Sequence, residues 1–197
     1  AHVLYADYLA DGSATDTGSA LYFPVIADDG AALNRLGSGL GVSLPANAGD
    51  RWGFDVAAVG DTYVIGGPGN DAAGTDAGEV RIGSFSDPGF VEVLSPDPSF
   101  DPARLGTAVA VDGDRMVASA PFESAGASGA GVVYVYERAS ASSPWELATS
   151  IASPAPEFRG GFGDALDLRG PLLAIGESDR FGDRAEPGRV WVYAFTG

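Results

Sequence analysis

The 197-residue sequence contains no cysteine and only one histidine. Without cysteine the chain forms neither disulfide bonds nor thiolate metal sites. His2 lies at the terminus without a defined partner, and no Ser-His-Asp arrangement can be placed in the sequence. Nucleophilic catalysis therefore has no candidate residues, and we expect that the chain is not an enzyme.

Lysine is also absent, so the 11 basic residues are all arginine, against 27 acidic residues. The net charge of −16 repels nucleic acid and anionic membrane surfaces, and we expect neither as a partner. Two explanations of the acidity stay open. One is adaptation to high salt, which screens the repulsion between like charges, and the other is a genome that favours GC-rich codons.

Long apolar runs are missing as well. No run approaches the roughly 20 residues that span a bilayer, so membrane insertion is not expected. The only methionine is Met116, so the first residue is not an initiator. Removal of a signal peptide explains this, as does a boundary within a longer protein, and we expect an extracellular or cell-surface location.

The sequence does contain an internal repeat. Each unit begins with an aromatic residue or leucine followed by glycine, and continues with an alternating strand, a tight turn and a second apolar strand. This pattern occupies residues 52–68, 105–121 and 162–178. In each unit a further glycine follows ten residues later, at Gly78, Gly131 and Gly188.

The period-2 patterning predicts an all-β fold with almost no helix. Third strands are expected at 79–82, 132–136 and 189–193, and fourth strands at 91–94, 145–151 and, less clearly, 33–40. The N-terminal segment matches the later half of a unit, with strands at 4–7 and 19–23. The predicted units, each the size of a β-propeller blade, are 1–47, 48–100, 101–156 and 157–197.

This division leaves the first unit without its innermost strand and the last without its outermost strand. The chain then holds about three and a half to four blades, whereas a propeller typically has 4–8. Three explanations stay open: a segment of a larger propeller, a small four-bladed ring, or assembly with other copies. Because an open stack exposes apolar faces, we favour a longer parent protein or self-association.

The units resemble the FG-GAP repeat, the blade of integrin α-subunit propellers and of many bacterial surface proteins. The FG half corresponds to Trp52-Gly53, Leu105-Gly106 and Phe162-Gly163. The GAP half corresponds to Gly66-Gly67-Pro68 and Ser119-Ala120-Pro121, and Gly176-Glu177-Ser178 departs from it. The resemblance implies a β-propeller, or a segment of one, that binds a partner outside the cell.

Many blades of that family carry a calcium loop between the first and second strands. Here those connections are short hairpins, which cannot supply the six to eight oxygens that calcium needs. A second hypothesis places a cation in the acidic loops between the second and third strands. Its oxygen ligands would come from Asp11, Asp16, Asn70, Asp71, Asp76, Asp179 and Asp183. The alternative, which their unequal spacing favours, is that these are ordinary turn residues.

By the same resemblance, the connections between units lie on the partner-binding face. A mixture of arginine and aromatic residues, typical of interface anchors, recurs there at Arg51, Phe100, Arg104, Phe158 and Arg159. The structural alternative is that each arginine pairs with a nearby acid and each phenylalanine fills the gap between blades.

The leading interpretation is a non-catalytic extracellular binding or adhesion module for a protein or glycan partner. One alternative is a structural subunit of a surface layer or filament, in which the chain associates with itself. A further alternative is a lectin-like or accessory domain of a secreted enzyme. Against the lectin alternative, the three tryptophans fall on predicted strands and are expected to serve in packing, not as sugar platforms.

Overall fold

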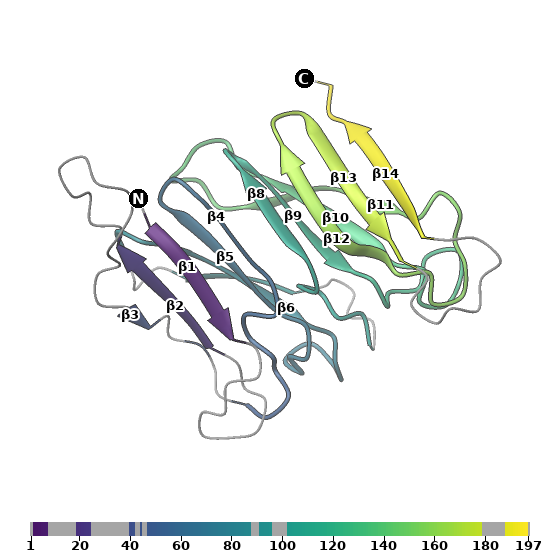
Figure 1. Cartoon of the computed structure of the whole chain (residues 1–197), viewed down its shortest axis with the longest axis horizontal. Helices are drawn as coiled ribbons and strands as arrows, with labels where there is room; N and C mark the ends of the chain where they lie inside the picture. Colours follow the sequence, from purple (N-terminus) through teal and green to yellow (C-terminus); the bar gives the residue numbers. More distant parts are fainter. Residues whose placement is uncertain are drawn as a thin grey trace.

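The computed structural model describes residues 2–7, 19–24, 40–41, 44, 47–87, 91–95, 102–178 and 188–196. The regular elements of these residues are all β-strands, which confirms the predicted all-β class. The strands form four antiparallel sheets that follow one another along the chain in an open row (Figure 1). Within the described residues, no helix has the length and apolarity needed to cross a membrane.

The second and third sheets have four strands each, in chain order. The second sheet comprises β4 (Val56–Val59), β5 (Thr62–Gly67), β6 (Glu79–Ser84) and β7 (Val91–Leu94). The third sheet comprises β8 (Val109–Asp112), β9 (Arg115–Ala120), β10 (Val132–Glu137) and β11 (Glu146–Ala152). In both sheets the first two strands are joined by a tight turn, as the sequence predicts.

The first and fourth sheets have three strands each. The first sheet comprises β1 (His2–Asp7), β2 (Ser19–Pro24) and β3 (Leu40–Gly41). The fourth sheet comprises β12 (Phe162–Arg169), β13 (Leu172–Glu177) and β14 (Arg189–Ala194). Among the described residues, the first sheet lacks a counterpart of β4 and the fourth a counterpart of β7. The row does not close into a ring, because these two sheets lie at its opposite ends (Figure 1).

Each interior sheet is apolar on both faces because successive side chains along a strand point to opposite sides. In β10, Val132, Tyr134 and Tyr136 pack in the core against the second sheet. Val133 and Val135 pack in the core against the fourth sheet. This double burial explains why β10 is almost uninterruptedly apolar in sequence.

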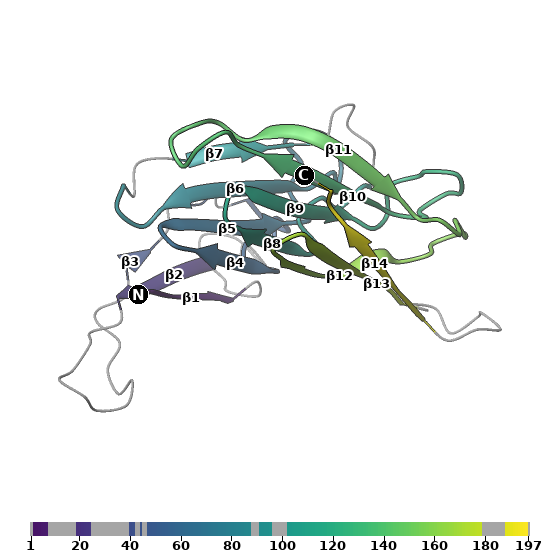
Figure 2. The same ribbon diagram turned by 90° about the horizontal axis from the view of Figure 1, so that it is seen from above.

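Neighbouring sheets contact one another mainly through their first and second strands. Figure 2 shows the first strands β4, β8 and β12 close together on one side, and the outer strands β7 and β11 on the other. The outer strands are consequently less tightly enclosed than the inner ones, which bears on the site described below.

The glycine that follows each GAP segment lets the backbones of two sheets touch. The Leu105 N–H donates to the Ala77 carbonyl at 2.9 Å, and a Cβ on Gly78 would lie only 2.3 Å from the Leu105 carbonyl oxygen. Gly131 and Phe162 repeat this contact one unit later, again with 2.3 Å between the virtual Cβ and the carbonyl oxygen. The recurring glycine therefore marks the point where the next sheet begins.

Replacing Gly78 with alanine is expected to lower the free energy of unfolding by about 2–4 kcal/mol, since steric overlap adds to the strain of a left-handed φ. Gly60→Ala is the matched control. Gly60 also has a left-handed φ, of 58°, but has open space where its Cβ would lie, so only the strain of about 1–2 kcal/mol applies. Urea unfolding measures both losses, and equal losses would contradict the close-approach explanation.

Candidate functional site

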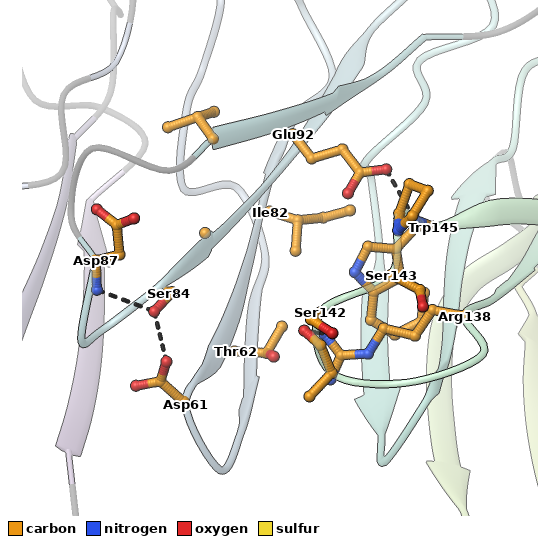
Figure 3. A pocket seen from close by; sticks show the side chains of 14 residues that line it. Asp61, Thr62, Ile82, Ser84, Asp87, Glu92, Arg138, Ser142, Ser143 and Trp145 are labelled. Atoms are coloured by element: carbon orange, nitrogen blue, oxygen red, sulfur yellow. Dashed lines mark hydrogen bonds between the residues drawn. The ribbon is translucent and has the colours of Figure 1, made fainter.

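A cavity of about 680 Å³ lies between the second and third sheets. Its lining comes from the β4–β5 turn, strands β6 and β7, the segment after β6, and the loop that joins β10 to β11. Figure 3 shows these groups arranged around a common space. The cavity therefore lies between strands β6 and β7 of the second sheet and the β10–β11 loop of the third.

The floor of the cavity is apolar. The side chains of Ile82 and Trp145 line it and are otherwise buried in the core between the two sheets. Val91 on β7 also lines the cavity and is 37% exposed. A ligand in the cavity would thus contact a buried aromatic ring and aliphatic side chains, which are the usual lining of binding pockets.

Arg138 forms one wall by stacking on Trp145. The Arg138 guanidinium carbon lies 4.6 Å from the centre of the Trp145 ring, a distance that permits a cation–π interaction. The Arg138 Nε–H donates to Asp114 Oδ1 at 2.7 Å, which fixes the orientation of the guanidinium group. The indole ring and the arginine therefore form a single rigid wall.

Glu92 connects the two sides of the cavity. Its Oε1 accepts a hydrogen bond from the Trp145 backbone N–H at 2.9 Å, so a side chain of the second sheet holds the main chain of the third (Figure 3). This link holds the loop that carries Trp145 against the second sheet.

Asp61 anchors the opposite rim. Its Oδ2 accepts hydrogen bonds from the hydroxyls of Ser84 and Ser86 at 2.5 and 2.6 Å, and its Oδ1 accepts from the Ser86 N–H at 3.0 Å. The Asp87 N–H donates to Ser84 Oγ at 3.0 Å, which continues the network. The rim is thereby preorganised and carries negative charge from Asp61, Asp87 and Glu92.

The lining of the cavity combines apolar, hydroxyl and carboxylate groups. Its lining contains no histidine and no cysteine. Throughout the described part of the chain, no three His, Cys, Asp or Glu side chains gather where they could hold a metal ion. The site offers apolar contact, hydroxyl groups from Ser142 and Ser143, and a carboxylate rim.

The four described residues of the predicted partner-binding face do not line this cavity. Arg51 and Arg104 adopt left-handed φ values of 56° and 58°. Arg104 donates to Asp76 Oδ2 at 3.3 Å and lies 4.5 Å from the centre of the Phe122 ring. The Arg104 side chain therefore ties the connection between units to neighbouring loops, which is the structural alternative considered for it above.

Phe158 and Arg159 form an exposed pair. Phe158 is 67% exposed, and the Arg159 guanidinium carbon lies 5.2 Å from the centre of its ring. Neither residue lines the cavity, and Phe100 lies outside the described residues. The partner-binding role of these residues stays a prediction.

Two polar side chains of the loop between β5 and β6 accept hydrogen bonds from backbone N–H groups of the same loop. Asn70 Oδ1 accepts a hydrogen bond from the Ala72 N–H at 3.0 Å, and Asp71 Oδ1 accepts from the Asp76 N–H at 2.8 Å. These are ordinary roles for Asn and Asp in turns. The other predicted cation ligands, Asp11, Asp16, Asp179 and Asp183, lie outside the described residues. The cation hypothesis stays a prediction.

A buried carboxylate in the β9–β10 loop was missed by sequence reasoning. Glu123 Oε2 accepts a hydrogen bond from the Tyr134 hydroxyl at 2.7 Å, and both side chains are buried. Burial raises the pKa of Glu123 above its ordinary value, an effect that the hydrogen bond from Tyr134 opposes. Burial also raises the pKa of Tyr136, to about 12. The repeat offered a signal, because Glu123 occupies the position of Asn70 in the preceding unit.

The sequence also gave no sign of the cavity. Its strands were predicted, but the contact between Glu92 and Trp145 joins residues far apart in the chain. Only the relative placement of two sheets brings them together, and strand periodicity carries no information about that placement.

Residues 45–82 match the FG-GAP repeat family. This stretch contains the Trp52-Gly53 pair, the GAP segment at 66–68 and Gly78, and it ends at Ile82 on the cavity floor. No curated protein matches the chain.

Glu123→Gln is expected to flatten the dependence of stability on pH. The folded pKa of Glu123 is raised, so as pH rises from about 4.5 the unfolded chain releases its proton first and the free energy of unfolding falls until the folded carboxyl has also ionised. Glutamine does not titrate and still accepts from Tyr134. Urea unfolding across this pH window should show wild type losing stability relative to the variant.

The exposed Glu146 supplies the control for this experiment, because Glu146→Gln removes the same charge from the surface. If the free energy of unfolding changed with pH in the same way in wild type and in the Glu123 variant, a raised pKa of Glu123 in the folded chain would be contradicted.

Proposed function

We propose that this chain, which carries an FG-GAP repeat at residues 45–82, is a non-catalytic extracellular binding module that takes a segment of a partner protein into its cavity. FG-GAP repeat domains are generally binding modules and are typically extracellular. The cavity between the second and third sheets is the feature of this chain that supports a specific binding site.

The buried floor of the cavity carries the proposal. Ile82 and Trp145 present apolar surface inside an opening of about 680 Å³, which is within the range of roughly 300–1,000 Å³ that ligand pockets occupy. One large aliphatic or aromatic side chain of a partner, with its flanking backbone, would fill such a space. The amides of that backbone would meet the hydroxyls of Ser142 and Ser143.

The charge of the rim indicates which partner segment fits. Asp61, Asp87 and Glu92 contribute three carboxylates, and the guanidinium of Arg138 is already paired with Asp114. The whole chain carries a net charge of −16, which disfavours acidic ligands. The proposed ligand is therefore a segment in which an apolar side chain lies beside an arginine or lysine.

Val91→Arg tests the site, because it places bulk and positive charge on an exposed residue of the cavity lining. Val93→Arg is the matched control, since Val93 lies on the same strand, is 44% exposed and does not line the cavity. The probes are an array of short peptides that combine Arg or Lys with Leu, Phe or Trp, and a glycan array. Titration calorimetry then measures the affinity of the best peptide.

The expected result is binding of basic–apolar peptides that weakens with added salt. Val91→Arg should reduce the affinity at least tenfold and Val93→Arg less than twofold. Failure of every peptide to bind would overturn the proposal. Binding of glycans alone would also overturn it and favour the lectin alternative.

A further inference from the structure

The three carboxylates that line the cavity differ in their surroundings. Asp61 is exposed and already accepts three hydrogen bonds, two from serine hydroxyls and one from a backbone N–H. Asp87 is exposed as well, so water and dissolved ions screen its charge. Glu92 is partly buried and accepts one hydrogen bond, from the Trp145 N–H at 2.9 Å. Glu92 is therefore the carboxylate that keeps hydrogen-bonding capacity in a sheltered position.

The second oxygen of the Glu92 carboxylate, Oε2, has no partner among the described residues. An ionised carboxylate has about four lone-pair positions, of which the Trp145 N–H occupies one. In the described lining the one basic residue is Arg138, and its guanidinium pairs with Asp114 at 2.7 Å. A partly buried charge without a counterion has an electrostatic cost, and a cation of the ligand would remove that cost.

Glu92 also lies next to the apolar floor of the cavity. It pairs with Ile82 across β6 and β7, so the two side chains lie on the same face of the second sheet. The Cβ atoms of such a pair are about 4.5–5.5 Å apart. Figure 3 shows the Glu92 side chain reaching past Ile82 toward Trp145. A ligand group that rests on Ile82 is therefore within reach of the Glu92 carboxylate.

We propose that Glu92 determines the specificity of the cavity by pairing with a cationic group that lies beside an apolar group in the ligand. The inference rests on the proposed function, in which that cation is the arginine or lysine of the bound segment. Its guanidinium or ammonium group donates to Glu92 Oε2 while the neighbouring apolar side chain contacts Ile82 and Trp145. Salt screens this partly buried pair less than it screens the exposed Asp61 and Asp87, which contribute mainly to long-range attraction.

Glu92→Gln tests the assignment, because glutamine keeps an oxygen that accepts from the Trp145 N–H and removes only the charge. Asp87→Asn is the matched control, since it removes an equal charge from an exposed residue of the same cavity. Titration calorimetry measures both variants with two peptides. One is the best basic–apolar peptide of the array, and the other has glutamine in place of its basic residue. Thermal unfolding confirms that both variants are folded.

Glu92→Gln should reduce the affinity for the basic peptide at least tenfold and that for the neutral peptide less than twofold. Asp87→Asn should change both affinities less than threefold. Equal losses for the two peptides in Glu92→Gln would show that the carboxylate acts only by holding Trp145, and the proposal would be wrong. Equal losses of the basic peptide in the two variants would also overturn it, because no single carboxylate would then select the cation.

Small probes distinguish failure of this inference from failure of the proposed function. Phenethylamine carries an ammonium group near an aromatic ring, and 2-phenylethanol has a hydroxyl in its place. Their binding is followed through the NMR signal of the Trp145 indole. If no peptide bound but phenethylamine bound wild type and not Glu92→Gln, the peptide partner would be wrong and the role of Glu92 would stand. Peptide binding that ignored the Glu92 charge would overturn that role alone. If neither phenethylamine nor any basic peptide bound, both proposals would be overturned.

Discussion

The close contact between the backbones of neighbouring sheets determines the rest of this structure. Gly66 and Gly106 approach so closely that neither position has room for a side chain. Van der Waals attraction between apolar faces is short-ranged, so valines of facing sheets interlock only if the backbones at their edge come this near. The distance between neighbouring sheets therefore determines where the repeat needs glycine. The strands between these glycines can vary in sequence without loss of the sheet stacking.

Polar links reinforce this stacking at the same boundaries. Carboxylates of one sheet accept hydrogen bonds from backbone N–H groups of the next, between Asp55 and Val109, Glu92 and Trp145, and Asp112 and Gly170. Burial raises the pKa of Asp55, and the two backbone N–H groups that donate to it oppose this rise. Part of the acidity of the chain thus has a structural role, because these carboxylates accept hydrogen bonds from backbone N–H groups that would otherwise be unpaired at the sheet boundaries.

The repeat made most strands predictable, since alternation and turn glycines are local properties. The strand at 91–94 was predicted with its observed ends, and the hairpin at Gly60 has the expected tight turn. Of the strand expected at 33–40, Leu40 lies in β3, and residues 33–39 lie outside the described residues. The position of Arg104 within the repeat did not reveal its contacts with Asp76 and Phe122, which depend on how three separate loops fold together.

The cavity originates in the way neighbouring sheets contact one another. The glycine contacts hold sheets together at their first and second strands, and this constraint weakens toward the outer strands. Between the second and third sheets, the resulting space is partly filled by Trp145 and left open beside Val91. A fold that depends on covering each sheet with the next leaves room for a ligand where that covering is incomplete, and the proposed binding cavity lies at such a place.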